Sequence, residues 1–395
     1  MSNPIKEPKE SYRTLQNLDE LKSGMVIAED VFNKNGHVLI AAGFVVDDVA
    51  KLKQFLTLHK VDQVRIRLHA TKYPVKAKKP KQEPVTPAET QPLDLTAREE
   101  ARLQKKRQME TKAFQDRYQV QKETIKTDFQ RMVKGEEVSK DRLEAQVIEI
   151  LKSYDGTVNV FQLIETIKKD YRDLYAHYYQ VTIISHSIGT WLELTPPQMK
   201  NLTLSALLHD LGKEQLSPEL ILAQNKLSTD EELEYQKHVV IGYELAKHYD
   251  FINYDMLQAI LLHHERSDGS GYPLGLKQEK IPLLARIIAI ADVYNTLTSP
   301  NSKGEKKTPF EAVKIMESEY MDQLDTRILY IFLNRIGNCF LGQLVHLNDG
   351  RVGEVIFVPR VYVYRPIIKL KPTNQLIDLS HRDHQKISIK AFAET

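Results

Sequence analysis

The stretch HHERSDGSGYP, residues 263–273, decides how this chain is interpreted. Two adjacent histidines and a glutamate precede a loop of small residues that closes on Gly271, Tyr272 and Pro273. Packing gives no reason to place paired imidazoles ahead of such a turn, whereas histidine is the commonest side-chain metal ligand. The stretch therefore predicts a metal site, with further ligands elsewhere in the chain.

The composition limits the class of protein. The 395 residues carry a net charge of +2, which gives little attraction for nucleic acid or an anionic membrane. Cys339 is the single cysteine, which excludes an internal disulfide and a cysteine-based zinc site. No apolar run is long enough to span a bilayer, and the polar N-terminus has no secretory apolar core. We expect a cytoplasmic protein without a membrane span and without specific nucleic-acid binding.

Sequence patterns predict a mainly α fold with five segments. Asn35-Gly36 between apolar runs indicates a hairpin in a small N-terminal α/β unit, and Asn348-Asp349-Gly350 indicates one near the C-terminus. The predicted segments are a small α/β domain (1–70), a Lys- and Pro-rich linker (71–95), a long connecting helix (96–139), a helical domain (140–336) and a β extension (337–395).

The connecting helix has one apolar face. Its apolar residues are spaced by four, seven, four and three positions, which places them on one side of a helix. They are Phe114, Tyr118, Ile125, Phe129 and Met132. This stripe can pack on the next domain or pair with a second copy of the chain, and the sequence favours the two equally.

A second cluster of polar residues occurs in LLHDLGKE, residues 207–214. His209 and Asp210 are adjacent at the end of an apolar helix, and Lys213 follows one turn later on nearly the same side. A buried carboxylate beside an imidazole is costly unless it is paired or bound to metal. Its two oxygens can each take one cation.

Helix geometry selects among the other histidines. In the helical hairpin expected here, His177 lies nearer than His186 to the level of His209, so His177 is the expected ligand and His186 is structural or solvent-facing. His238 lies inside a well-capped helix and is also an expected ligand. His248, near the end of that helix, is not.

Two further positions depend on where their helices point. His263 and His264 diverge by about 100° on a helix, so both reach one metal only if the helix end points at it. Asp292 follows an apolar run, and a buried carboxylate there needs a cation. Asp173, one turn before His177, is equally well explained as an oxygen ligand or as an acid favoured at a helix N-terminus.

Taken together, HDLGK, KH, HHERSDGSGYP, IPLLARIIAIADVY and LTS resemble the HD-GYP family, a branch of the HD-domain metal-dependent phosphohydrolases. The likeness runs from about His177 to Ser299. It implies an HD-type helical bundle and hydrolysis of the bacterial second messenger cyclic di-GMP to linear pGpG, in some members on to GMP. LKSGMVIAEDVFNKNGHVLIAAG and LVHLNDGRVGEVI resemble smaller units found before and after such domains.

The resemblance also implies roles for residues at matching positions. Asp210 is the implied bridge between metals, Lys213 the contact to the scissile phosphate, and Asp173 stands where some members have a third-metal glutamate ligand. The implied metal ligands are His177, His209, Asp210, His238, His263, His264 and Asp292. The implied substrate-binding residues are Lys213, Asp268, Gly269, Gly271, Tyr272, Pro273 and Arg286, of which Arg286 holds the substrate or the loop.

The cofactors implied are two divalent ions, or three if Asp173 is a ligand. Imidazole and carboxylate ligands without thiolate suit iron or manganese, with zinc or nickel as alternatives. Two such ions, about 3.5–4 Å apart, can share a hydroxide that attacks phosphorus in line. Lys213 would neutralise charge on the non-bridging oxygens.

Three departures from the family pattern put substrate fit and rate in question. Asn295 stands where an aspartate is usual, Glu214-Gln215 where aliphatic residues are usual, and PNSKGEKKTPF (300–310) where Arg-Pro-Tyr is frequent. Two other functions stay open. One is a non-catalytic nucleotide-binding or scaffold protein, and the other is a phosphohydrolase acting on cGAMP, another nucleotide or an unrelated phosphoester.

Overall fold

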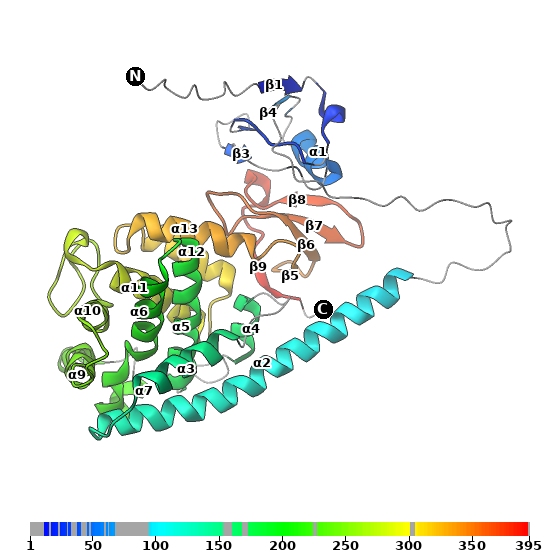
Figure 1. Cartoon of the computed structure of the whole chain (residues 1–395). Coiled ribbons are helices and arrows are strands. Elements are labelled where there is room, and N and C mark those ends of the chain that lie inside the picture. The colour runs from blue at the N-terminus through cyan, green and yellow to red at the C-terminus, as the bar shows by residue number, and fades with distance from the viewer. Residues whose placement is uncertain are drawn as a thin grey trace, which may run out of the picture. The chain divides into compact units, whose positions relative to one another are not determined.

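The computed structural model describes most of residues 12–67 and the ranges 95–152, 160–167, 173–223, 227–300 and 305–393. The chain divides into two compact units, Met1–Leu93 and Asp94–Thr395 (Figure 1). The predicted Asn35-Gly36 turn and the linker residues 71–94 lie outside the described residues.

The first unit is a small mixture of strands and one helix. Strand β1 (Tyr12–Leu15) pairs antiparallel with β4 (Val64–Arg67), and β2 (Val31–Phe32) pairs antiparallel with β3 (Val38–Ile40). Helix α1 (Val49–Leu58) completes the described elements together with the short 3₁₀ helix η1 (Leu18–Glu20). Its described core side chains include Leu15, Ile27, Leu56 and Ile66.

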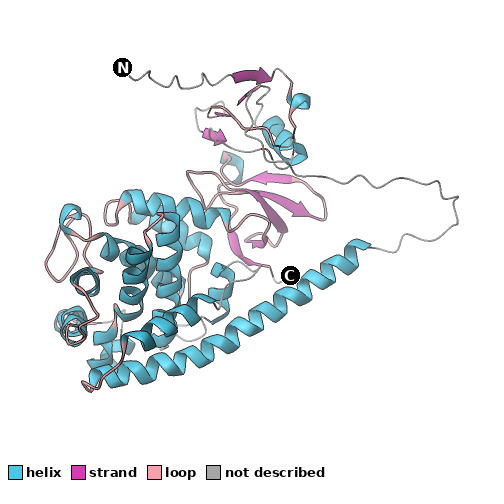
Figure 2. Ribbon diagram, in the orientation of Figure 1, coloured by secondary structure: helices cyan, strands magenta, loops and turns pink. Residues whose placement is uncertain are grey.

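The second unit is dominated by helices, as Figure 2 shows. Several begin where the sequence supplies a cap: Ser228 and Glu231 form a capping box at one start, and Thr308 and Glu311 form one at another. The α-helices are α2 (Leu95–Val133), α3 (Lys140–Lys152), α4 (Val160–Ile167), α5 (Leu174–Trp191), α6 (Pro196–Leu208), α7 (Pro218–Ala223), α8 (Thr229–Gln236), α9 (His238–Ala246), α10 (Tyr254–Leu262), α11 (Leu283–Thr298), α12 (Pro309–Glu319) and α13 (Thr326–Asn338). The 3₁₀ helices are η2 (Leu211–Gln215), η3 (Gln278–Lys280) and η4 (Arg382–His384).

Helix α2 spans 39 residues, about 58 Å at the usual helical rise. Its apolar stripe is buried: Phe114, Ile125 and Phe129 are fully covered and belong to the main core of the unit. The Phe129 ring stacks on Tyr178 with centroids 5.2 Å apart. The stripe therefore packs within its own unit, which is one of the two arrangements expected from the sequence.

Helices α5, α6 and α11 form the centre of the bundle. Each is apolar on most of its circumference, which is typical of a helix buried on several sides. They pack against one another and against α10 and α13. These buried helices, or the turns that follow them, carry most of the polar residues singled out in the sequence.

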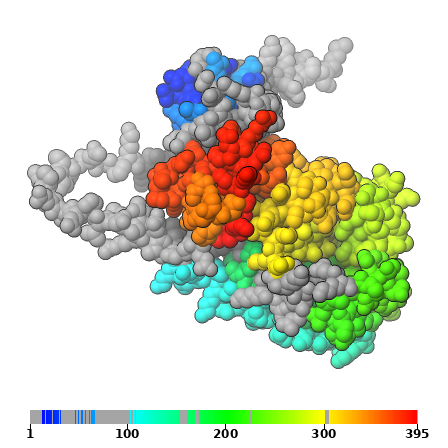
Figure 3. Space-filling model, turned by 180° about the vertical axis from the view of Figure 1, so that it is seen from behind, coloured from blue at the N-terminus to red at the C-terminus, as the bar shows by residue number. Residues whose placement is uncertain are grey.

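The chain ends in a five-stranded antiparallel sheet with strand order β8-β7-β6-β5-β9. Gly350, at φ +86°, makes the turn between β5 and β6 where the sequence predicts an Asn-Asp-Gly hairpin. Val345, Val355 and Ile368 join the same core as the helices, and Figure 3 shows the sheet packed against them. The strands are β5 (Leu344–Leu347), β6 (Val352–Phe357), β7 (Ile367–Lys371), β8 (Leu376–Asp378) and β9 (Ile389–Phe392).

The expected fold class, mainly α with a small α/β unit before the bundle and a β extension after it, is confirmed. Among the described residues, no helix combines the length and the apolar character that crossing a membrane requires.

Candidate metal centre

Four imidazoles surround the fully buried carboxylate of Asp210. The Nε2 atoms of His177 and His209 lie 3.1 and 3.2 Å from its Oδ2. The Nε2 atoms of His238 and His263 lie 3.2 and 3.5 Å from its Oδ1. Each carboxylate oxygen therefore faces two histidines, which is the arrangement expected if one carboxylate joins two cation sites.

Main-chain carbonyls set the tautomer of three of these histidines. In each case Nδ1 lies within hydrogen-bond distance of the carbonyl three residues earlier. Because a carbonyl only accepts, Nδ1 carries the proton and Nε2 of the neutral ring presents a lone pair. The contacts are His209 to Ala206 (2.8 Å), His238 to Tyr235 (2.6 Å) and His263 to Ile260 (2.8 Å).

These lone pairs face the negatively charged oxygens of Asp210 and are repelled by them. A cation bound between the nitrogens and the oxygens would remove this repulsion. Among the described residues, Asp210 Oδ1 and the Nε2 atoms of His238, His263 and His264 are buried without a hydrogen-bond partner. Each such group costs about 1–3 kcal/mol if it stays unsatisfied. Bound divalent ions would satisfy all of them at once, so the residues present fit a metal centre.

The charge states point the same way. Burial lowers the pKa of His263 to about 4 and lowers the pKa values of His177, His238 and His264, so these rings are neutral near pH 7. Burial alone would raise the pKa of Asp210, but the neighbouring His209 and Lys213 hold it well below its usual range. Neutral imidazoles and an ionised carboxylate are the forms that bind metal.

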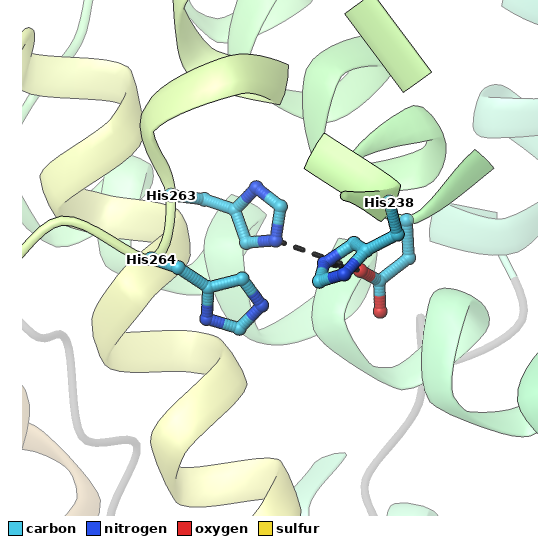
Figure 4. A group of neighbouring side chains, drawn as sticks. His238, His263 and His264 are labelled. Atoms are coloured by element: carbon cyan, nitrogen blue, oxygen red, sulfur yellow. Dashed lines mark ion pairs between the residues drawn. The ribbon is translucent and has the colours of Figure 1, made fainter. Parts of the chain in front are cut away.

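The possible ligands fall into two groups that share Asp210. The first contains His177 and His209, and the second His238, His263 and His264, with candidate ligand atoms within 4.8 Å of one another in each group. Figure 4 shows the three rings of the second group gathered around one point. His263 is the C-cap of α10, so the end of that helix points at the site and both adjacent histidines reach it.

Asp292, on α11, lies between the two groups. Its Oδ1 is 3.3 Å from His177 Nε2, and its Oδ2 is 3.9 Å from His264 Nδ1. Nearby histidines and Lys213 lower its pKa against the opposing effect of burial. The structure thus brings together the seven residues that the sequence predicts as ligands.

Close main-chain packing sets the distance between two of the ligand-bearing elements. A Cβ atom on Gly212 would lie 2.0 Å from the carbonyl oxygen of His238 and 2.6 Å from the amide nitrogen of Gly242. The backbone of η2, next to Asp210, therefore rests directly on the backbone of α9. The glycine in HDLGK lets Asp210 reach His238.

Lys213 is buried beside Asp210, with its Nζ 2.5 Å from Asp210 Oδ2 and 5.3 Å from the centre of the Tyr235 ring. Burial would lower the pKa of Lys213, but the Asp210 carboxylate raises it well above its usual value. A charged ammonium group thus lies at the edge of the candidate metal centre.

A cavity of about 580 Å³ opens above this centre. Its lining includes three candidate ligands, His177, His264 and Asp292, together with Lys213 and Tyr272. The volume lies within the range of small-molecule sites. A phosphorylated ligand in this cavity would therefore lie against both the candidate metal ligands and the ammonium group.

Comparison with known families shows what this part of the chain resembles. Residues 162–328 match a family described as HD domain. This part of the chain is therefore similar to HD domains. The resemblance to the HD-GYP family is confirmed by the curated relatives of this segment.

One relative is the cyclic di-GMP phosphodiesterase PA4108 of Pseudomonas aeruginosa, 32% identical over 52% of this chain and 51% of that protein. Another is the 3′3′-cGAMP-specific phosphodiesterase 1 of Vibrio cholerae, 31% identical over 40% of this chain and 37% of that protein. The chain thus spans from about a third to about half of the length of these relatives. A solved HDG"Y"P protein, Bd1817 from Bdellovibrio bacteriovorus, aligns with 82% of this chain and 99% of its own at 17% identity and a TM-score of 0.47.

Asn295 contacts one of the candidate ligand histidines. Asn295 Nδ2 lies 2.8 Å from His177 Nδ1, while Asn295 Oδ1 is buried without a hydrogen-bond partner. Turning the amide end for end lets Oδ1 accept the Nδ1 proton, which leaves the lone pair on Nε2. Where the family resemblance implies an aspartate, the partner of His177 is therefore a neutral amide.

Asp173 is the N-cap of α5, and its carboxylate is engaged outside the metal centre. Its Oδ1 accepts from Ala176 N at 3.1 Å. Its Oδ2 accepts from Tyr118 Oη at 2.8 Å and from Lys122 Nζ at 2.7 Å, both on α2. The helix-capping explanation is observed, and the contact with α2 was not foreseen.

The loop that follows the paired histidines is braced from within. Glu265 is buried and accepts from the amide nitrogens of Leu274 at 2.7 Å and Leu276 at 2.8 Å. Gly271 has no room for a side chain, because a Cβ there would lie 2.4 Å from Arg266 N. This bracing brings the Tyr272 ring into stacking contact with His264, at 4.7 Å between centroids.

The other residues predicted to bind substrate shape this loop and do not line the cavity. Asp268 accepts from Ser270 N and Oγ, and Gly269 takes the positive φ of +87° that the turn requires. The guanidinium of Arg286 pairs with Asp325, which caps α13. The two roles predicted for Arg286, holding the substrate or holding the loop, stay predictions, because its observed partner is the cap of α13.

The sequence reasoning missed several residues that line the cavity: Gln180, Glu232, Tyr235, Gln236 and Arg266. Two of them, Tyr235 and Gln236, come immediately before Lys237-His238 in the sequence. Their position next to a predicted metal ligand could have identified them as cavity residues. Glu232 lies in a strongly charged helix that reads as solvent-exposed.

Proposed function

We propose that this chain is a phosphodiesterase that uses divalent metal ions to hydrolyse cyclic di-GMP to linear pGpG, with GMP as the further product if the second bond is also cut. The observation that carries the proposal is the pairing of two histidines with each oxygen of buried Asp210, directly below a cavity with a charged lysine. The relatives named cyclic di-GMP phosphodiesterases support the choice of substrate.

We further propose two ions, iron or manganese, held on the two sides of Asp210. His177 and His209 would serve one, and His238, His263 and His264 the other, with Asp292 between them. Asp173 argues against a third ion, because Lys122 and Tyr118 already occupy its Oδ2. When bound, such ions activate water and neutralise the charge of a phosphodiester.

The chain's own residues position the substrate and stabilise its charge. Lys213 would move from Asp210 to a non-bridging phosphate oxygen as the cations take over the carboxylate. Burial raises the pKa values of Tyr235 and Tyr272, so both phenols stay protonated and can donate hydrogen bonds. Asn295 holds His177 in the tautomer that presents its Nε2 lone pair.

A second candidate substrate is 3′3′-cGAMP. Two relatives from Vibrio cholerae, 31% and 30% identical to this chain, carry that specificity in their names. Both substrates share the phosphodiester that the centre would attack and differ in one base. The choice between them therefore depends on the cavity wall and not on the metal ligands.

The test is turnover by protein loaded anaerobically with iron or manganese. Wild type and Asp210→Ala would each receive cyclic di-GMP and 3′3′-cGAMP, and products would be separated by chromatography. We expect wild type to form pGpG, with GMP as well if both bonds are cut, and we expect no turnover by the variant. Two bound metals per chain without hydrolysis of either substrate would contradict the proposal and favour a binding or scaffold role.

A further inference from the structure

One wall of the cavity is formed by α8, the short helix that ends two residues before His238. Three of its residues line the cavity: Glu232, Tyr235 and Gln236. Their spacing of three and four positions places them on one face of the helix. The inference drawn from this face rests on the proposed function and concerns which base the cavity accepts.

The carboxylate of Glu232 is available to a ligand. Its neighbours on the helix are engaged, because Glu231 accepts from Ser228 in the capping box and Glu234 pairs with Lys237. In the described part of the chain, no hydrogen bond or ion pair involves the Glu232 side chain.

The other lining carboxylates are committed. Asp173 is bound to α2, and Asp292 faces His177 and His264. Of the carboxylates that line the cavity, Glu232 is therefore the one that can accept hydrogen bonds from the N–H groups of a nucleobase.

The position of Glu232 suits the base of a nucleotide whose phosphate lies beside Lys213. Tyr235 lies between Glu232 and Lys213, because it follows Glu232 by about one helical turn and its ring centre is 5.3 Å from Lys213 Nζ. Glu232 precedes Tyr235 by three residues, about 4.5 Å along α8. Together with the distance from Tyr235 to Lys213, this is within the length that a nucleotide spans from its phosphate to the far edge of its base.

We propose that Glu232, assisted by Gln236, selects guanine over adenine in the bound nucleotide. Guanine presents two adjacent donors, N1–H and the N2 amino group, and a carboxylate accepts both. The amide of Gln236 supplies a donor for O6. Adenine presents a donor beside a lone pair at N1, so the same carboxylate meets one partner and one repulsion.

The test compares three substrates with metal-loaded full-length protein: cyclic di-GMP, 3′3′-cGAMP and cyclic di-AMP. The variant is Glu232→Gln, which keeps the shape and replaces one acceptor oxygen by a donor. We expect kcat/KM for cyclic di-GMP to fall about 10- to 100-fold, since a charge-assisted hydrogen bond is lost. We expect kcat/KM for cyclic di-AMP to rise, because an amide pairs with the donor and acceptor of adenine.

Glu234→Gln is the matched control, because it is the same substitution on the same helix outside the cavity lining. We expect it to leave all three values unchanged. A purely structural role for Glu232 would move the three substrates in one direction. That result, or an unchanged ratio between cyclic di-GMP and cyclic di-AMP in Glu232→Gln, overturns the inference.

Calorimetric binding of the same nucleotides separates this inference from the proposed function. If wild type hydrolyses nothing yet prefers cyclic di-GMP over cyclic di-AMP, and Glu232→Gln reverses the preference, base selection stands and the hydrolytic function falls. If wild type neither binds nor hydrolyses any of the three, both are refuted.

Discussion

The contact between η2 and α9 makes Gly212→Ala a sharp test of how the metal centre is built. The added Cβ would lie 2.0 Å from His238 O, whereas real Cβ contacts are essentially never below 3.0 Å. The two backbones must therefore move apart by about 1 Å. Both atoms that the Cβ meets, His238 O and Gly242 N, belong to the main chain, so no side chain can rotate away to relieve the clash.

Such a shift separates Asp210 from His238, which now lie 3.2 Å apart at their closest ligand atoms. Metal-ligand distances tolerate about 0.2 Å. A misplacement of about 1 Å costs on the order of 100-fold in rate, and overpacking costs about 1–3 kcal/mol in stability. We expect Gly212→Ala to fold, to melt a few degrees lower, and to lose about 100-fold in both metal affinity and turnover.

Gly337→Ala is the control. A Cβ there would lie 2.6 Å from Val363 Cγ1 and 2.9 Å from Val358 Cγ1, so it also crowds the core of the same unit, but against side chains remote from the ligands. Metal affinity would be measured by competition with a chelator and metal content by mass spectrometry. The reasoning is refuted if Gly212→Ala binds metal as tightly as Gly337→Ala.

Three other outcomes can be checked on the same protein. Chelation should lower the melting temperature measured by calorimetry, because bound ions at 100 times their Kd stabilise by about 2.7 kcal/mol; an unchanged melting temperature would argue against a centre formed in the folded state. Lys213→Met should lower kcat about 100- to 1,000-fold while two ions remain bound, and loss of the ions instead would assign the lysine to the metal site. In metal-free protein the folded pKa of His263, about 4, lies below the unfolded value of 6.5, so the unfolded state binds more protons between these limits and stability should fall as pH drops from 6.5 to 4. Denaturant unfolding across this range tests that sign.

Much of the candidate centre could be predicted because helix periodicity constrains direction. The expected hairpin of α5 and α6 favours His177 over His186, and the two nitrogens of His177 and His209 indeed lie 3.2 Å apart. The sequence also predicted that His263 and His264 can both reach one site only if the end of their helix points at it. Helix α10 does end at His263, and both histidines reach the site.

What the sequence could not supply depends on contacts between distant segments. The bond between Lys122 and Asp173 joins residues 51 positions apart, and it follows from how α2 lies on the bundle. Glu232 belongs to a helix with acidic residues on both its exposed and its cavity-facing side, so its charge alone does not mark the cavity-facing side. The partner of Arg286, Asp325, lies 39 positions away and could not be foreseen from the sequence.

The buried stripe of α2 determines which segment of this protein can be transferred between genes as one folded domain. Sequence similarity marks residues 162–328, but one continuous core runs from Phe114 on α2 to Ile389 on β9. Recombination that moved residues 162–328 alone would remove the contact between Phe129 and Tyr178 and would expose apolar surface to water. The block that can pass intact between genes therefore includes the long helix and the terminal sheet, and the borders of sequence similarity lie inside it.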